Sequence, residues 1–152
     1  MCKNHMDWIL EDVAIGNIYV GSDLDYLINN DIRAVVCALP KLPHSINIYQ
    51  QKGIKVFHVP IDDHPEVPIS IWFDKVSTFM LKQRLDHKKI LVHCYAGISR
   101  SVSLTVAFLM NLLCCDDQTC LLWIKNKRSC ANPNVGFLKE LNRYYHILKQ
   151  RK

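Results

Sequence analysis

The segment KILVHCYAGISRSVSLTVAFLM, residues 89–110, joins a short apolar run to a longer one through a loop with one cysteine, one glycine and one arginine. Residues 89–93 predict a strand buried within a sheet, because the run is short and rich in branched apolar side chains. Residues 100–113 predict a fully buried helix. The loop from Cys94 to Arg100 therefore follows the carboxyl end of a strand, where open α/β sheets bind their ligands.

The residue types in this loop suit the binding of a phosphate group. Backbone N–H groups in such a loop can converge on one anion, and the start of the helix adds partial positive charge. Gly97 permits a backbone turn that a side chain would obstruct, and the planar guanidinium of Arg100 can hold two phosphate oxygens. The same positive surroundings favour the thiolate of Cys94 over the thiol. The spacing Cys-x-x-Gly-x-x-Arg-Ser thus favours a nucleophile over a buried structural cysteine beside an unrelated arginine.

The rest of the chain alternates between predicted strands and helices. Strands are expected at residues 12–15, 17–21, 32–39, 54–60 and 89–93, the first two around a turn at Gly16-Asn17. Helices are expected at residues 23–30, 70–87, 100–113, 116–126 and 134–149, with a further helical segment ending at Gly53. Ser22, Asp116 and Asn134 are the expected capping residues. This order predicts an α/β fold in a single domain over residues 1–152, with a central, mainly parallel twisted sheet of about five strands flanked by helices.

The composition limits the compartment and the cofactors. The 152 residues are 49% hydrophobic and carry a net charge of +5, an ordinary globular mixture. Seven cysteines are an odd number, and the first residues lack the features of an export signal. We therefore expect reduced cysteines and a cytoplasmic location, with the nucleus also open. Neither CxxC nor HxxxH spacing occurs, so no metal and no cofactor are expected.

The loop resembles the signature loop of the cysteine-dependent protein phosphatases, specifically that of their dual-specificity branch. The resemblance rests on residues 93–101 and extends to AFLM at 107–110, NPNVGF at 132–137 and IYVGS at 18–22, in the family's order. It implies the compact cysteine-phosphatase fold. It also implies an enzyme that hydrolyses phosphotyrosine and phosphoserine/threonine monoesters through a phosphocysteine intermediate.

The resemblance further implies a role for each residue of the loop. Cys94 attacks phosphorus, and the hydroxyl of Ser101 stabilises the thiolate as it leaves in the second step. His93 shapes the loop and helps to set the ionisation of Cys94 without transferring a proton itself, although a plain core role stays open. The phosphate oxygens are held by backbone amides and by one guanidinium. The substrate-binding residues are Tyr95, Ala96, Gly97, Ile98, Ser99 and Arg100.

A general acid is expected in the segment HVPIDDHP, residues 58–65. A departing alkoxide or phenoxide needs a positioned acid, and this segment follows a buried strand at the same edge of the sheet as Cys94. In related phosphatases the acid lies three residues after the proline of a similar segment, which is Asp63 here. Asp62 stays the alternative acid. If neither residue is catalytic, both are solvated turn aspartates.

The loop favours a protein substrate. Its variable positions, Tyr95, Ala96, Ile98 and Ser99, are uncharged, whereas lipid-directed relatives tend to carry lysines there, and RNA-directed relatives more often have threonine at Ser101. Inositol phosphates or lipids and RNA 5′-triphosphate ends are the alternative substrates. A catalytically silent phosphate-binding module is the third interpretation. The expected partner is a phosphorylated protein, with no nucleic acid, no membrane and a monomeric state.

Other cysteines and basic residues have less specific interpretations. Cys37 stands where some relatives carry a second cysteine that bonds to the nucleophile under oxidation, but an inert strand cysteine is preferred. The basic residues Lys125, Lys127 and Arg128 suit a second phosphate or an acidic docking segment, but a solvated helix end is preferred. The cysteines expected only to pack are Cys114, Cys115, Cys120 and Cys130.

Overall fold

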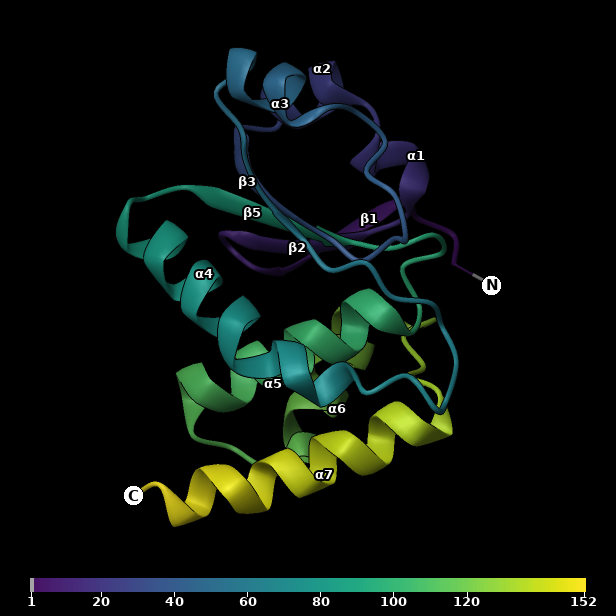
Figure 1. Ribbon diagram of the computed structural model, residues 1–152, viewed down its shortest axis with the longest axis vertical. Helices are drawn as coiled ribbons and strands as arrows, with labels where there is room; N and C mark the ends of the chain where they lie inside the picture. Colours follow the sequence, from purple (N-terminus) through teal and green to yellow (C-terminus); the bar gives the residue numbers. More distant parts are fainter. Residues whose placement is uncertain (1) are drawn as a thin grey trace.

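The computed structural model describes residues 2–152 and places a five-stranded sheet between two layers of helices (Figure 1). The strands are β1 (Met6–Leu10), β2 (Val13–Gly16), β3 (Ile32–Cys37), β4 (Lys55–His58) and β5 (Lys89–His93). Their order across the sheet is β1-β2-β5-β3-β4. β1 pairs with β2 in the antiparallel sense, and the other pairs are parallel. The predicted mainly parallel α/β sheet is therefore confirmed.

The helices divide between the two faces of the sheet (Figure 1). One face is covered by α1 (Ile18–Gly21), α2 (Leu24–Asn29) and α3 (Ile46–Gln51). The other is covered by α4 (Phe73–Leu85), α5 (Arg100–Leu113), α6 (Asp117–Lys127) and α7 (Val135–Gln150), with the short 3₁₀ helix η1 (Ile69–Trp72) before α4. Successive strand residues point to opposite faces, so Val36 joins the core cluster under α4–α7, and Val35 and Cys37 join the cluster under α1–α3.

The strand–loop–helix unit that positions Cys94 has the predicted bounds. Both ends of β5 and of α5 fall where the sequence placed them. Every residue from Ser101 to Met110 is buried, which explains why this helix carries apolar residues around most of its circumference. The buried hydroxyls of Ser103 and Thr105 donate to the carbonyls of Ser99 and Ser101, one turn earlier, so that neither is left without a partner.

The segment before α2 differs from the prediction. The hairpin turn lies at Glu11–Asp12 between β1 and β2, and the segment 17–21, expected to be a strand, forms the cap and the helix of α1 (Ile18–Gly21). The Asn17 side chain accepts hydrogen bonds from the N–H groups of Tyr19 and Val20, so that Asn17 begins a helix rather than a turn between strands. A run of four apolar residues is too short to show which period it follows.

Helix caps follow the sequence, with one shift. Asp23, and not Ser22, caps α2 by accepting from the N–H of Tyr26. Asp116 and Asn134 cap α6 and α7, as expected. In all three cases a short polar side chain satisfies an N–H group that the first helical turn leaves free.

Two expectations about the cysteines are wrong, namely that Cys130 only packs and that all the cysteines are reduced. Cys130, expected to be a packing residue, forms a disulfide with Cys2, and the Cα atoms of the pair are 5.2 Å apart. The bond joins the segment before β1 to the connection between α6 and α7. Cys37, Cys94, Cys114, Cys115 and Cys120 are free thiols.

No single helix within residues 2–152 is long and apolar enough to cross a bilayer, and α5 and α6 pass such a test only as a pair bent by 117°.

Candidate active site

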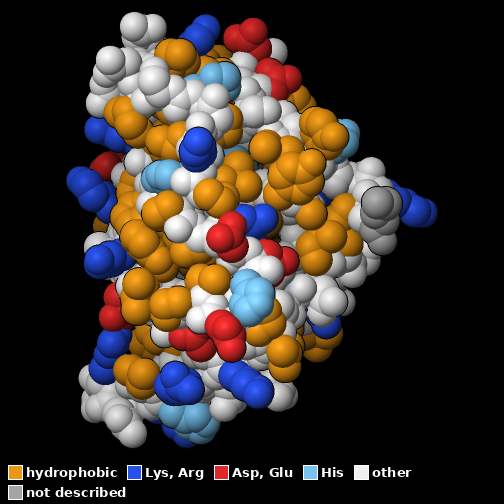
Figure 2. Space-filling view, turned by 45° about the vertical axis from the view of Figure 1, so that its right-hand side comes forward, with side chains coloured by type: hydrophobic (Ala, Val, Ile, Leu, Met, Phe, Trp, Pro, Cys, Tyr) orange, Lys and Arg blue, Asp and Glu red, His pale blue; other side chains and the backbone are white. Residues whose placement is uncertain are grey.

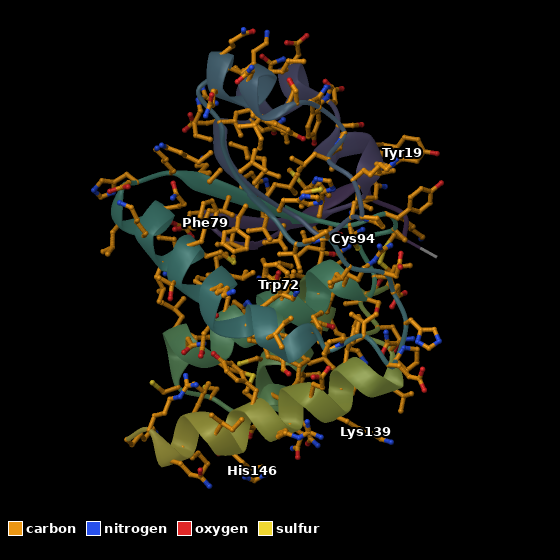
Figure 3. The ribbon with its side chains drawn as sticks, viewed as in Figure 1. Tyr19, Trp72, Phe79, Cys94, Lys139 and His146 are labelled. Atoms are coloured by element: carbon orange, nitrogen blue, oxygen red, sulfur yellow. A yellow bond between two sulfur atoms is a disulfide. The ribbon has the colours of Figure 1, made fainter. Side chains whose placement is uncertain are left out.

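Cys94 lies directly after β5, close to the first turn of α5, on the right-hand side of the molecule in Figure 3. The residue is 2% exposed. Its Sγ atom is 3.1 Å from the Oγ of Ser101 and accepts a hydrogen bond of 3.3 Å from the N–H of Gly97. Hydrogen bonds to sulfur stabilise a thiolate more than a thiol. The structure thus brings together Cys94, Gly97 and Ser101, as predicted.

Every backbone carbonyl from Cys94 to Ser99 accepts a hydrogen bond from a group on the outer side of the loop. The Cys94 carbonyl lies 3.3 Å from Nδ1 of His93, and the Tyr95 carbonyl accepts from the N–H of Ile18. The carbonyls of Ala96 and Gly97 accept from Arg128. Those of Ile98 and Ser99 accept from the N–H groups of Asn132 and Ser103.

These bonds determine where the loop's N–H groups point. Residues 2–152 contain no cis peptide bond, and in a planar trans peptide the N–H is opposite the preceding carbonyl. Carbonyls held on the outside therefore turn the N–H groups of residues 95–100 toward the inside, where that of Gly97 meets the sulfur. The positive φ of Gly97, 69°, belongs to the region that favours glycine. The result is a ring of donors above a nucleophile, the geometry that binds a tetrahedral oxyanion.

Arg100 connects this loop to the segment expected to carry the acid. Its Nη1 donates to the carbonyl of Ile61 at 3.0 Å. Its Nε is buried and has no hydrogen-bond partner within residues 2–152. A buried guanidinium donor without a partner is costly in the absence of a ligand, and an oxygen of a bound phosphate would satisfy it.

The two candidate acids differ in their contacts. Both Asp62 and Asp63 are exposed. The side-chain amide of Asn134 donates to Oδ1 of Asp63 at 2.8 Å, and the Asn134 backbone N–H donates to Oγ of Ser99 at 2.9 Å. Asn134 thereby links the Asp63 carboxylate to the phosphate-binding loop. The sequence predicts Asn134 as a cap but does not show which loop lies opposite it.

His93 is fully buried, and this burial lowers its pKa from the ordinary 6.5 to about 4. The imidazole is therefore neutral near pH 7, and its Nδ1–H donates to the Cys94 carbonyl. Gly21 packs against the ring so closely that any side chain at that position would overlap it. A neutral, enclosed ring fits the expectation that His93 shapes the loop without transferring a proton.

Cys37 and Cys94 belong to different core clusters. Burial raises the pKa of Cys37 to about 12, and the charge of Cys94 adds to this rise, so this side chain stays a thiol near neutral pH. These features favour the interpretation of Cys37 as an inert strand cysteine.

The basic residues Lys125, Lys127 and Arg128 lie in two different environments. Lys125 and Lys127 are exposed, as expected of a solvated helix end. Arg128 is only 1% exposed, so the expectation is wrong for it. Its guanidinium packs against the phosphate-binding loop, a placement that a run of four polar and basic residues does not reveal.

On the face of the molecule that Figure 2 brings forward, apolar side chains lie next to acidic and basic ones. At the entrance to the loop, Tyr95 is 61% exposed, and Tyr19 at the start of α1 is 67% exposed. The N–H of Ile18 bonded to the Tyr95 carbonyl places the two tyrosines on adjoining segments. The border of the site is therefore aromatic on the side of α1, whereas the exposed Asp62 and Asp63 lie on the segment after β4.

Comparisons with known proteins agree with this geometry. Residues 15–147 match the family described as dual specificity phosphatase, catalytic domain. The chain is 32% identical over 146 residues to dual specificity protein phosphatase 22 of Homo sapiens, covering 93% of this chain and 74% of that protein. It is 33% identical to human dual specificity protein phosphatase 15, of which it spans 44%. A crystal structure of DUSP15 superposes with a TM-score of 0.86 at 31% identity, covering 96% of this chain and 90% of that one.

Proposed function

Since the chain belongs to the dual-specificity phosphatase family, a family of protein phosphatases, we propose that it hydrolyses phosphotyrosine and phosphoserine/threonine monoesters in proteins through a phosphocysteine intermediate. The observation that carries the proposal is the loop from Cys94 to Arg100. Its carbonyls are all bonded outward, and its inward N–H groups surround a buried sulfur. Such a site serves an oxyanion and a nucleophile together.

In the first step the Cys94 thiolate attacks phosphorus in line. An S–P bond forms as the P–O bond to the substrate breaks, and the Asp63 carboxyl gives its proton to the departing oxygen. Arg100 and the loop amides hold the three other oxygens, whose charge they stabilise in the transition state. The hydrogen bond from Asn134 keeps Asp63 beside the loop, which favours Asp63 over Asp62 as the acid.

In the second step water attacks the phosphocysteine. Asp63, now ionised, takes a proton from this water, the S–P bond breaks, and inorganic phosphate leaves. Ser101, with its hydroxyl 3.1 Å from the sulfur, donates a hydrogen bond to the thiolate as it reforms. Apart from the attacking water, both steps use side chains and backbone amides of this chain.

The border of the site supports a phosphoprotein rather than a polyphosphate. The exposed residues that follow Cys94 in the loop, Tyr95 and Ala96, are aromatic or small, and the loop contains no lysine. A ligand with several phosphates would leave charge unneutralised at this border. A signalling role is part of the proposal, since phosphoproteins are its substrates, and the cytoplasmic or nuclear location stays a prediction from the sequence.

Turnover measured in the presence of EDTA on a panel of substrates tests the proposal. The panel comprises phosphotyrosine and phosphothreonine peptides, doubly phosphorylated peptides, inositol phosphates and triphosphate-ended RNA. We expect hydrolysis of the peptides, and a loss of at least about 1,000-fold in kcat for Cys94→Ser. Wild-type turnover by Cys94→Ser would exclude the mechanism, and hydrolysis of RNA or inositol phosphates alone would exclude the substrate class.

The neighbouring aspartates supply a matched pair for the acid. We expect Asp63→Asn to lower kcat by about 100-fold or more, because the leaving oxygen then departs without a proton. Asp62→Asn, which removes the same charge one position away, should leave kcat within a few-fold of wild type. The reverse order would assign the acid to Asp62.

A further inference from the structure

Arg128 is the largest of the fully buried side chains, and its guanidinium is directed at the phosphate-binding loop. It is 1% exposed. Its Nε donates to the Gly97 carbonyl at 2.8 Å and its Nη2 to the Ala96 carbonyl at 3.3 Å. Two consecutive loop carbonyls are thus held by one planar fork, whose fixed geometry an ammonium lacks.

These two bonds act on the N–H groups that face Cys94. The carbonyl of Ala96 shares a peptide plane with the N–H of Gly97, and the carbonyl of Gly97 shares one with the N–H of Ile98. Arg128 therefore orients two donors of the ring. One of them, the N–H of Gly97, is the group that donates to the Cys94 sulfur.

The far side of Arg128 is anchored to the segment before and within β1. Its Nη1 donates to the Asn4 carbonyl at 3.0 Å and to Oδ2 of Asp7 at 2.8 Å. The Cys2–Cys130 disulfide joins the same two segments beside these contacts. A buried guanidinium whose charge has a carboxylate partner is held in one orientation.

The loop has little room to adopt another position. A Cβ atom at Gly97 would lie 2.6 Å from Nη2 of Arg128 and 2.7 Å from the Gly16 carbonyl. Gly97 is thus packed between Arg128 and the end of β2. The orientation of the Gly97 peptide therefore depends on Arg128, whose side chain fills this space.

We propose that Arg128 is a positioning residue of the active site, which orients the N–H groups of Gly97 and Ile98 toward Cys94 and the bound phosphate, with Asp7 fixing its guanidinium. The inference rests on the proposed function of the Cys94 loop. It extends the functional unit to the segment before β2, which contributes no atom to the phosphate site itself.

Alkylation of Cys94 by iodoacetate tests the proposal without turnover, because only the thiolate reacts. The rate is measured against pH by mass spectrometry of the peptide that contains Cys94. We expect Arg128→Met to shift the midpoint of this profile to higher pH and to slow alkylation near pH 6 by about 10-fold, since one donor to the sulfur is lost. Arg128→Lys, which keeps the charge but lacks the planar fork, should give an intermediate shift.

Tungstate affinity and steady-state kinetics provide the second readout. We expect Arg128→Met to weaken tungstate binding and to lower kcat/KM by about 10-fold to 100-fold, as for the loss of an oxyanion donor. Asp7→Asn leaves Arg128 in place but removes its charge partner, and should change both values in the same direction by less. Lys127→Met removes an exposed charge next to Arg128 and should match wild type in every measurement.

The outcomes separate positioning from plain packing. Wild-type alkylation profiles and tungstate affinities in folded Arg128→Lys and Asp7→Asn would overturn the proposal, even if denaturant unfolds both variants more easily. These two variants decide the matter if Arg128→Met does not fold. Failure of the proposed function is a different result, in which wild-type protein hydrolyses no phosphopeptide although the alkylation profiles still differ.

Discussion

His93 makes the stability of the protein depend on pH in a direction that its burial determines. The folded protein keeps the imidazole neutral until its pKa of about 4, whereas the unfolded chain takes up a proton near the ordinary value of 6.5. Between these values only the unfolded state is protonated. The free energy of unfolding therefore decreases as the pH falls from 6.5 toward 4.

We expect this residue to reduce the free energy of unfolding by about 2 kcal/mol between pH 7.5 and pH 5. Urea denaturation followed by fluorescence at the two pH values measures the change. His93→Asn cannot be protonated, so its decrease over the same interval should be smaller, whatever its stability at pH 7.5. An equal decrease in both proteins would show that other groups cause the acid sensitivity.

Some residues of the site could be predicted from the sequence, and others could not. Cys94, Gly97, Arg100 and Ser101 were identifiable because their chemistry is local, within one loop of fixed spacing. Arg128 was not, because its role comes from carbonyls about thirty positions earlier in the chain, and its neighbours in sequence are exposed lysines. The burial of Arg128 is a property of the packed structure and cannot be predicted from the residues around it in the sequence.

At the level of elements, the site depends on two loops that follow parallel strands. β4 and β5 both pair with β3 in the parallel sense, so their carboxyl ends meet at one edge of the sheet. The start of α7 approaches the first of these loops closely. Any side chain at Gly136 would overlap the backbone of Pro65, two residues after Asp63.

We expect Gly136→Ala to push this loop away from α7 and to separate Asp63 from Asn134. The acid then contributes less, so kcat should fall by about 10-fold or more with phenyl phosphate. The fall should be smaller with p-nitrophenyl phosphate, whose leaving group needs a proton less. Val135→Ala, at the exposed neighbouring position, should show no such difference between substrates, and equal losses on both substrates for Gly136→Ala would contradict this explanation.

The elements themselves were predicted to different degrees. β5 and α5 were predicted to the residue, because the strand has a short buried run and the helix a long one, with an arginine at its start. The sequence predicts a strand at residues 17–21, but residues 18–21 form α1, because a single helical turn shows no period and the Asn17 side chain caps it. Long periodic elements can therefore be predicted from the sequence, whereas helices of a single turn cannot.

At the level of the whole molecule, the Cys2–Cys130 disulfide encloses almost the entire chain, with a sequence separation of 128. A cross-link over such a span restricts the unfolded ensemble strongly. Its existence was not predictable, because the pairing of distant cysteines follows from the fold and from no local pattern. An odd cysteine count pointed instead to reduced thiols.

We expect reduction of this disulfide to lower the free energy of unfolding by about 2–5 kcal/mol. Denaturant midpoints measured with and without a thiol reductant give the change. The double variant Cys2→Ser, Cys130→Ser should be insensitive to the reductant, and Cys114→Ser should respond as wild type does. Identical midpoints of the wild type in both conditions would argue against a stabilising cross-link.

The outward bonding of the loop carbonyls has a thermodynamic consequence for ligand binding. Since each carbonyl from Cys94 to Ser99 already has its partner within the protein, an arriving phosphate finds its donors ordered and does not have to restrict the backbone. The conformational entropy of the loop is lost during folding rather than during binding. Calorimetry of oxyanion binding should therefore show a small change in heat capacity, because little apolar surface is buried and no segment folds around the ligand.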